Sequence, residues 1–365
     1  MKHHFKQITI IGVGLMGGSL GLAIKRRLHG TEVCGVDSTD VLRKARRRGA
    51  IDRAETDLRK AVSSADLVLL ACPTKTILRL LPRIARFASP STIVSDVGSV
   101  KSAIVQLGEK LFPYGNFIGG HPMAGVELSG IEAAHPLLFE NAVYVLTPTT
   151  STSAQQLRRL ATFLQALGAR VMVMDAETHD HVAAAVSHLP QLTAVALVNV
   201  VGRRHTKARS HLGLAAGGFR DLTRIASSRF GIWNDILAEN RANVDKAVQM
   251  LIEELERYRS QLRKKRFSAL RKEFEAARAL RSAIPRNMKG FLHTLQDVYV
   301  YVQDRPGMLA AMTGALAKAK VNIKDLELLK VREGSGGTFR LSFDSTEIAR
   351  QAARILRRKG FEVET

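Results

Sequence analysis

The 365-residue sequence predicts three domains: an α/β Rossmann-type dinucleotide-binding domain, an all-helical domain and a small C-terminal βαββαβ domain. Up to about residue 175, short β-rich segments alternate with helical spacing, which is typical of a parallel, doubly wound sheet covered by helices. From Glu177 to about Ala283 the pattern is almost wholly helical, and strands begin again after a basic Pro/Gly segment. We therefore expect domains at residues 1–175, 176–284 and 296–365, with a linker at 285–295.

Seven segments of the first domain have the composition of strands, and helical spacing separates most of them. They are Ile8–Ile11, Glu32–Val36, Asp66–Ala71, Thr92–Asp96, Phe117–Gly119, Ala142–Thr147 and Arg170–Met174. In the second domain, Val182–Val201 and Ile232–Leu262 look like long helices with apolar stripes. Such stripes need more cover than one small domain supplies, which is consistent with a partner subunit.

The last domain is a compact series of strands and helices. Its segments are a strand at Val298–Val302, a helix at Met308–Ala319, a strand at Asn322–Lys330, a hairpin at Gly334–Gly337, a strand at Thr338–Phe343, a helix at Thr346–Lys359 and a strand at Phe361–Glu364. This order is the βαββαβ arrangement that defines the predicted domain.

Composition favours a protein of a reducing compartment. Cys34 and Cys72 both lie in strand-like apolar segments, so buried reduced thiols are favoured over a disulfide or a metal pair. The N-terminal residues run into a strand without the apolar segment of a signal peptide, and no uninterrupted run of 18 apolar residues occurs. We expect a cytoplasmic protein without a membrane span and without a metal site.

The formal net charge of +22 would suit a nucleic acid, a membrane surface or an anionic substrate. Between Arg257 and Lys289, twelve Lys or Arg residues stand against two acids in a helical pattern. A solvated helix face explains this better than a nucleic-acid site, because no recognition motif accompanies it and aromatic residues make up only 5%. A basic cleft would also attract a dianionic substrate.

A glycine-rich turn, Gly12-Val-Gly14-Leu15-Met16-Gly17, follows the first strand and opens a helix. In such a turn the first glycine permits the tight bend, the second lets the backbone approach a pyrophosphate, and the third lets helix and strand close together. Asp37 ends the second strand, where a carboxylate accepts from both ribose hydroxyls and repels a 2′-phosphate. The turn therefore predicts NAD, against the alternative of a βα turn without cofactor in which Asp37 only caps a helix.

Two further glycine-rich segments, Asp96–Lys101 (DVGSVK) and Gly119–Glu127 (GGHPMAGVE), lie at strand ends, where open α/β sheets bind ligands. His121, between glycine and proline, is well placed for acid–base work beside a nicotinamide. From its position alone, His121 is equally compatible with a capping or packing role.

These segments, with SHLP at Ser187–Pro190 and FRDLTRIA at Phe219–Ala226, occur in the order seen in the prephenate and arogenate dehydrogenase family, which the chain resembles from Ile8 to Ala283. The resemblance implies NAD-dependent oxidative decarboxylation in a dimer, with the active site between the first two domains. It also implies that His121 is the catalytic histidine and that Ser99 contacts it and the substrate hydroxyl. Arg224 matches the arginine that binds substrate carboxylate, with Glu127 and Asp221 around it.

One position departs from the family pattern. Many members read SHLPH, with a second histidine that touches substrate, whereas this chain has Gln191, which can hydrogen-bond but carries no charge. Ser187 and His188 are retained as candidate substrate contacts, although a helix-facing histidine is more often a packing residue. A neutral Gln191 favours prephenate over arogenate, because the ammonium of arogenate would favour an acid.

The C-terminal domain resembles an ACT domain, with DRPGML at its first turn and Asn322-Ile323 opening its second strand. That resemblance implies an amino-acid effector, for which we expect tyrosine, bound by Asp304, Pro306, Gly307, Leu309, Asn322 and Ile323. A structural or dimerising module without ligand is the alternative.

Two other functions stay open from the sequence. One is a different dehydrogenase of the β-hydroxyacid or 6-phosphogluconate type, which the GGHPMAG and FRDLTR segments disfavour. The other is an NAD-sensing, ACT-regulated protein that binds nucleic acid through the basic helix. It predicts salt-dependent binding to DNA or RNA and no NADH production from prephenate.

Overall fold

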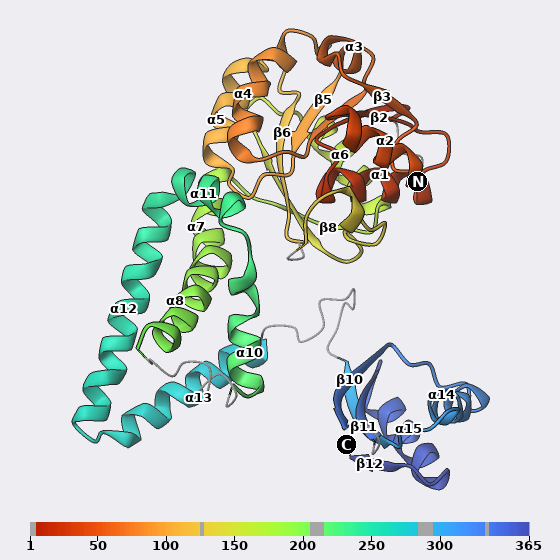
Figure 1. Cartoon of the computed structure of the whole chain (residues 1–365), viewed down its shortest axis with the longest axis vertical. Coiled ribbons are helices and arrows are strands. Elements are labelled where there is room, and N and C mark those ends of the chain that lie inside the picture. The colour runs from red at the N-terminus through yellow and green to blue at the C-terminus, as the bar shows by residue number, and fades with distance from the viewer. Residues whose placement is uncertain (1–4, 125–127, 205–214, 284–294, 333–335, 365) are drawn as a thin grey trace. The chain divides into compact units, whose positions relative to one another are not determined.

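The computed structural model describes residues 5–124, 128–204, 215–283, 295–332 and 336–364 (Figure 1). The chain divides into two compact units, Met1–Arg271 and Lys272–Thr365. The first unit contains a mixed α/β part followed by helices, and the second contains a small antiparallel sheet. The three domain boundaries expected from the sequence stay a prediction, and most of the expected linker lies outside the described residues.

An eight-stranded sheet forms the centre of the first unit, in the order β3-β2-β1-β4-β5-β6-β7-β8. Its strands are β1 Gln7–Ile11, β2 Glu32–Val36, β3 Arg53–Glu55, β4 Leu67–Leu70, β5 Ile93–Asp96, β6 Phe117–Pro122, β7 Val143–Pro148 and β8 Arg170–Val173. The seven expected strands are present, and the short edge strand β3 was not expected. Its three residues carry two charges and show no apolar run.

The expectation of a wholly parallel sheet is wrong at one pair of strands. All neighbours pair in parallel except β6 and β7, which pair antiparallel with Gly120 opposite Leu146 and His121 opposite Val145. Parallel neighbours need a crossover element, usually a helix. Among the described residues between β6 and β7, the only helical element is the 3-10 turn Ile131–Ala133. Without a crossover helix there, β7 runs beside β6 in the opposite direction.

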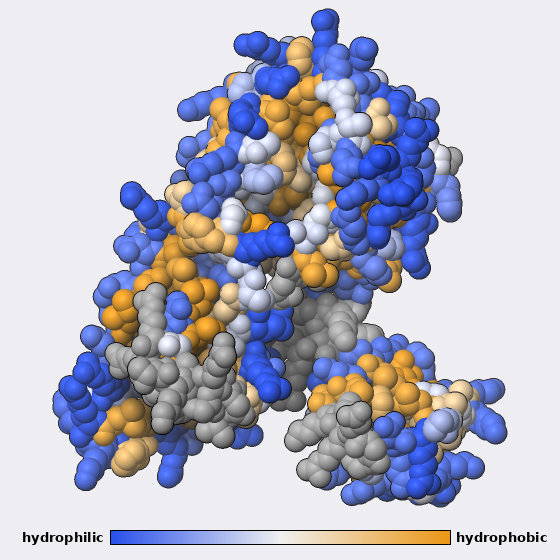
Figure 2. All heavy atoms as spheres, viewed as in Figure 1, coloured by the Kyte–Doolittle hydropathy of each residue, from blue (hydrophilic) through white to orange (hydrophobic). Residues whose placement is uncertain are grey.

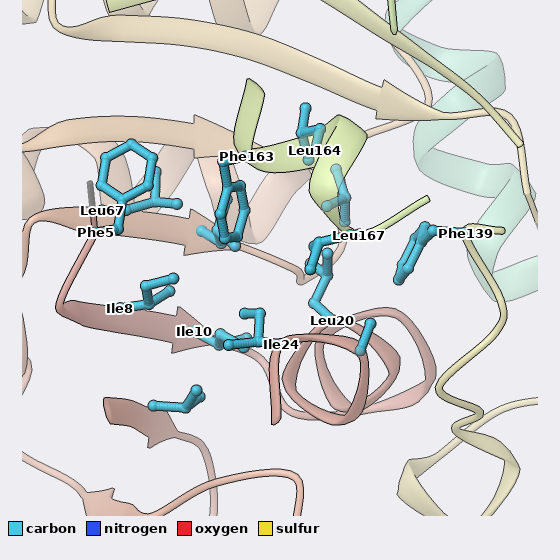
Figure 3. Close-up of a cluster of buried hydrophobic side chains, with 14 of the residues drawn as sticks. Phe5, Ile8, Ile10, Leu20, Ile24, Leu67, Phe139, Phe163, Leu164 and Leu167 are labelled. Carbon is cyan, nitrogen blue, oxygen red and sulfur yellow. The ribbon is translucent and has the colours of Figure 1, made fainter. Parts of the chain in front are cut away.

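Helices cover both faces of the sheet (Figure 1). They are α1 Leu15–Arg27, α2 Thr39–Arg47, α3 Leu58–Ser63, α4 Thr74–Ala85, α5 Ser102–Leu111 and α6 Ala154–Ala166. Successive strand residues point to opposite faces, so Ile10 of β1 joins the hydrophobic cluster under α1 and α6, and Ile11 joins the cluster under α3, α4 and α5. Figure 3 shows the first cluster, where Phe5 packs edge-to-face on Phe163 with ring centroids 5.4 Å apart.

The remaining helices of the first unit follow β8. They are α7 Ala176–Ala183, α8 Leu189–Arg204, α10 Gly217–Thr223, α11 Phe230–Glu239, α12 Arg241–Arg263 and α13 Phe267–Ala283, which crosses into the second unit. Both long helices expected from the sequence are interrupted. A π-helical turn, Ala184–His188, separates α7 from α8, and Asn240, with φ −110° and ψ 22°, separates α11 from α12. Apolar periodicity does not register such local breaks.

The second unit contains a four-stranded antiparallel sheet in the order β10-β11-β9-β12. Its elements are β9 Gln296–Val302, α14 Met308–Lys318, β10 Asp325–Arg332, β11 Gly336–Phe343, α15 Thr346–Arg358 and β12 Glu362–Glu364. This is the expected βαββαβ order, and Val298, Val300 and Leu341 lie in its core. Asn322 and Ile323 precede β10 rather than opening it.

Hydrophobic side chains are exposed on the helical part of the first unit (Figure 2), among them Val186 on the π turn, Val200 on α8, and Met250 and Leu255 on α12. Within the described residues, the helical stretch Ala176–Gly202 is long and apolar enough to cross a membrane by length and composition. One such helix is weak support for a membrane span, because the core helix of a soluble protein passes the same test. The exposed stripe matches the expectation that these helices need further cover.

Candidate active site

The glycine-rich turn has the geometry that close approach of a phosphate requires. Gly12 has φ +90°, and a Cβ there would meet the Ala71 carbonyl oxygen at 2.5 Å. A Cβ on Gly17 would meet the Gly12 carbonyl oxygen at 1.9 Å, so this glycine lets α1 close on β1. Gly14 precedes α1, and the space beside its Cα is open. The first amides of α1, at Leu15 and Met16, are donors without an intrahelical partner and favour an anion.

Asp37 lies at the end of β2 beside this turn. Its Oδ2 accepts a hydrogen bond from the Val13 amide at 2.8 Å, and its Oδ1 accepts one from the Ser38 amide at 2.7 Å. Each carboxylate oxygen keeps further acceptor capacity for a ribose hydroxyl. Ser38, and not Asp37, is the N-cap residue of α2, which disfavours the capping alternative. The residues present therefore fit a dinucleotide.

His121 lies on β6, next to the last residue of the strand, and is 8% exposed. Its Nδ1 is 2.8 Å from Nε2 of His179 on α7, and Nδ1 of His179 is 2.8 Å from Oδ1 of Asp180. Burial, and next the neighbouring His179 and Lys101, hold the pKa of His121 well below its ordinary value. The imidazole is therefore neutral at physiological pH, as a general base must be.

A buried ion pair holds the peptide that precedes His121. Lys101 and Asp96 are fully buried and paired through Nζ and Oδ2. The ammonium also donates to the Gly120 carbonyl at 2.8 Å, and the Gly120 amide donates to Asp96 Oδ1 at 3.1 Å. Breaking such a pair costs about 3–5 kcal/mol, because one charge is left buried and unpaired. The DVGSVK segment thus anchors the strand that carries the histidine.

Asp180 is the second anchor of the site. Its Oδ1 accepts from the Lys101 amide at 2.7 Å and its Oδ2 from the Ser102 amide at 2.8 Å, at the start of α5. Burial acts to raise the pKa of the Asp180 carboxyl, but hydrogen bonds from His179 and from Ser102 and Lys101 together hold it below its ordinary value. The side chain is therefore a fixed carboxylate that joins α7 to α5.

The π turn carries two of the expected substrate contacts. Ser187 is partly buried there, and His188 is buried with its Nδ1 3.3 Å from the amide nitrogen of Asn240. The Nε2 of His188 has no hydrogen-bond partner among the described residues, and burial lowers its pKa to about 4. Asn240 also donates to the Asp180 carbonyl at 2.7 Å. The break between α11 and α12 thus places the Asn240 amide beside His188 and the Asp180 carbonyl. Turns of π-helix, such as the one that carries His188, are frequent at functional sites.

The other expected substrate residues are more scattered. Gln191 is buried, and its amide donates to the Ile225 carbonyl at 3.0 Å, one residue after Arg224. Arg224 and Asp221 are exposed. Ser99 is partly buried, and its hydroxyl makes no hydrogen bond to another described residue, His121 included. Glu127 lies outside the described residues.

The residues expected to bind an effector belong to the second unit. Asp304, Pro306 and Gly307 form an exposed turn before α14, where Gly307 has φ +86°. Leu309 is exposed on the first turn of α14. Asn322 is exposed in the segment before β10, and Ile323 beside it is partly buried.

Four residues of the site were not expected from the sequence: Lys101, His179, Asp180 and Asn240. The pair His179-Asp180 was visible only as two polar residues in a helical segment, and the lysine as the last letter of DVGSVK. A surface cavity of about 600 Å³ lies elsewhere, between α2 and β3. Within the described chain, no group of three or more His, Cys, Asp or Glu side chains is arranged to hold a metal ion.

Family models match most of the chain in three successive segments. The model described as prephenate dehydrogenase, nucleotide-binding domain, matches residues 20–173, and that described as prephenate dehydrogenase, dimerization domain, matches 175–276. The ACT domain model matches 297–361. A prephenate dehydrogenase of Bacillus subtilis is 34% identical over 352 residues, which cover 96% of this chain and 95% of the relative.

The chain belongs to the prephenate dehydrogenase family. Solved structures of the family have the same fold. The prephenate dehydrogenase of A. aeolicus, in complex with hydroxyphenyl propionate and NAD+, has a TM-score of 0.73 at 32% identity, covering 78% of this chain and 100% of that one. The arogenate dehydrogenase of Synechocystis has a TM-score of 0.68 at 31% identity, covering 76% and 99%. These comparisons confirm the Rossmann-type domain, the helical domain and the ACT domain.

Proposed function

We propose that this protein is an NAD-dependent prephenate dehydrogenase that converts prephenate to 4-hydroxyphenylpyruvate and carbon dioxide in tyrosine biosynthesis. The observation that carries the proposal is a neutral, buried imidazole at position 121, held beside the sheet edge that also bears the dinucleotide turn. Membership of the family and the A. aeolicus complex with NAD+ and hydroxyphenyl propionate support the same assignment.

Prephenate carries a hydroxyl opposite a carboxylate on its ring. Loss of hydride from the hydroxyl-bearing carbon lets the carboxylate leave as carbon dioxide while the ring becomes aromatic, so few protein groups are needed. Bound NAD supplies the hydride acceptor. His121 accepts the hydroxyl proton through Nε2, and Ser99, on the loop after β5, orients the same hydroxyl.

Arg224 binds a substrate carboxylate, because its planar guanidinium matches a carboxylate with two parallel hydrogen bonds. Gln191 and Ser187 line the same region from α8 and the π turn, with His188 beside them. Asp221 and Glu127 match the acids that the family places around this arginine, and Glu127 lies outside the described residues. The link from Gln191 to the Ile225 carbonyl supports this grouping, because it ties α8 to the segment that carries Arg224.

Prephenate is favoured over arogenate because Gln191 offers no negative charge to the ammonium of arogenate. The Synechocystis relative, named an arogenate dehydrogenase, keeps arogenate as the second candidate substrate. Comparing kcat/KM for the two substrates distinguishes them, and a clear preference for arogenate would contradict this assignment.

Replacing His121 with Asn tests the catalytic assignment. We expect kcat to fall by about 10²–10⁴, since loss of a general base typically has that effect, while NADH affinity stays unchanged. The measurement is NADH absorbance with purified protein, NAD and prephenate, with NADH binding followed separately by fluorescence. An unchanged kcat in the variant would remove His121 from the role.

The oligomeric state, the effector and the compartment of the enzyme are further parts of the proposal. The exposed apolar stripe on α8 and α12 and the match to a dimerization domain support a homodimer. The ACT domain supports an amino-acid effector, for which the pathway product tyrosine is our candidate. We place the enzyme in the cytoplasm, where NAD-dependent biosynthesis and reduced Cys34 and Cys72 are expected.

A further inference from the structure

A continuous series of hydrogen bonds connects the catalytic histidine to a carboxylate on another element. It runs from His121 on β6 to His179 and Asp180 on α7, with each nitrogen–nitrogen or nitrogen–oxygen distance at 2.8 Å. The imidazole rings of the two histidines meet edge-to-face, with centroids 5.0 Å apart and planes at 71°. His179 is 3% exposed and Asp180 is 2% exposed, so water does not compete for these bonds.

The carboxylate determines which nitrogen of each ring carries a proton. An ionised carboxylate only accepts, so Nδ1 of His179 must be the protonated nitrogen, and a neutral His179 then has its lone pair on Nε2. That lone pair faces Nδ1 of His121, which must therefore be the donor. A neutral His121 with a proton on Nδ1 has its remaining lone pair on Nε2, the nitrogen left for the substrate.

We propose that His179 and Asp180 are positioning residues, which hold His121 in the one tautomer that can accept a proton through Nε2. The proposal rests on the proposed function, because it assigns a role within the same site. The orienting carboxylate of a Ser-His-Asp triad acts similarly on one histidine, whereas here a second histidine transmits the orientation.

The Asp180 carboxylate is held in one orientation by hydrogen bonds to other elements. The amides of Lys101 and Ser102 bind Oδ1 and Oδ2 of Asp180, which fixes the rotation of the group. Asn240 holds the Asp180 carbonyl at 2.7 Å and so fixes the helix backbone as well. The bonds to α5 therefore decide which carboxylate oxygen faces His179.

The same arrangement stores the substrate proton during turnover. As hydride leaves the substrate, the O–H proton moves to Nε2 of His121, and the resulting imidazolium donates through Nδ1 to His179. Transfer of that Nδ1 proton to Nε2 of His179 places the positive charge next to the Asp180 carboxylate. When carbon dioxide leaves and the ring becomes aromatic, the phenolate oxygen takes a proton back, so every group ends the turnover as it began.

The experiment replaces His179 with Gln and with Ala, and uses His181→Ala, an exposed position on the same helix, as the matched control. We expect kcat to fall about 100-fold in His179→Ala, within the range for a general base that is lost. In His179→Gln we expect a loss of about 10-fold, because the glutamine carbonyl can accept from His121 Nδ1 but cannot carry a proton. KM for prephenate and the Kd for NADH should change less than about twofold, as in His181→Ala.

Added imidazole gives a readout that a purely structural role would not move. It should restore kcat of His179→Ala at least about fivefold, with a rescue that rises with the neutral imidazole fraction, and leave His181→Ala unchanged. Normal kcat in both His179 variants would overturn the proposal, and so would equal losses in both without rescue by imidazole. If His121→Asn also kept full activity, or the wild type failed to turn over prephenate or arogenate, the proposed function itself would be wrong.

Discussion

At the scale of single residues, the site depends on groups whose protonation is set by burial. Burial lowers the pKa of His121 well below its ordinary value and that of His188 to about 4. Burial likewise lowers the pKa of the Lys101 ammonium, although the adjacent Asp96 carboxylate opposes this. The two histidines are therefore neutral in the folded state and become protonated when the chain unfolds below their ordinary pKa.

This difference predicts acid lability at mild pH. The unfolded chain binds more protons than the folded chain below pH 6.5, so the free energy of unfolding falls as pH decreases from 6.5 towards about 4. Each of the two histidines contributes a slope of up to about 1.4 kcal/mol per pH unit. Urea unfolding at pH 7.5, 6 and 5 measures it. His188→Gln should reduce the slope, and a free energy that stays constant from pH 7.5 to 5 would contradict the argument.

The activity should persist to lower pH than it would if the general base had the ordinary pKa of an exposed histidine. Because the pKa of His121 is lowered, the acid limb of the kcat/KM profile should lie below pH 6.5. The profile is measured with prephenate at saturating NAD, over a pH range in which the protein stays folded. A limb centred above pH 6.5 would mean that His121 is not the titrating base.

At the scale of elements, two glycines of the glycine-rich turn have different roles, one in helix packing and one in ligand approach. A Cβ at Gly17 would collide with the Gly12 carbonyl, whereas a Cβ at Gly14 meets nothing within 4 Å. Gly17 therefore matters for packing of α1 on β1, and Gly14 for the approach of a ligand to the backbone. A structural turn without cofactor would need only the first of these.

Alanine at each position distinguishes the two roles. We expect Gly17→Ala to lower the melting temperature by several degrees, because α1 must move away from β1 and the loss is about 1–3 kcal/mol. Gly14→Ala should leave the melting temperature within about two degrees but weaken NADH binding about tenfold or more. Differential scanning fluorimetry and NADH fluorescence titration give the two numbers. Unchanged NADH affinity in Gly14→Ala would show that the dinucleotide lies elsewhere.

Element type and order could be predicted from the sequence, because alternation of β-rich and helical segments is a local signal. The antiparallel pairing of β6 and β7 could not, since it depends on what the chain does between the two strands. The break at Asn240 could not either, because both flanking helices keep one apolar pattern across it. Tertiary contacts, such as the bond from Asn240 to the Asp180 carbonyl, accompany the break.

The candidate site was predictable where a motif surrounds the residue. His121 and the turn residues lie within glycine-rich segments at strand ends, a position that favours ligand binding in open α/β sheets. His179 and Asp180 lie 58 and 59 positions after His121 in an ordinary helical segment, so only folding brings them together. Lys101 has no local signal that tells a buried, paired ammonium from a solvated one.

At the scale of the whole molecule, the proposed catalytic residues His121 and Ser99 and the ACT domain belong to different compact units. The solved chain of the A. aeolicus relative is matched over its whole length by only 78% of this chain. A dehydrogenase of this family therefore folds in a chain shorter than the 365 residues here. Catalysis and effector response should therefore be separable by truncation.

Deleting residues 296–365 tests this. We expect kcat for prephenate to stay within about threefold of the full-length value, while inhibition by tyrosine and the tyrosine-induced rise in melting temperature disappear. Both are measured by NADH absorbance and thermal unfolding, with and without tyrosine. Inhibition that persists in the truncated protein would place the effector site outside the ACT domain. No response in the full-length protein would support the alternative of a structural ACT module.

The Asp180 carboxylate accepts the amides at the start of α5 and, through His179, is linked to His121, the proposed proton acceptor of the reaction. Any replacement at position 180 therefore changes folding and turnover together, and neither can be adjusted there without the other. An engineer who wants a different substrate should leave that position alone. Gln191, whose amide donates to the Ile225 carbonyl and which lies outside the series His121, His179 and Asp180, is the better place to begin.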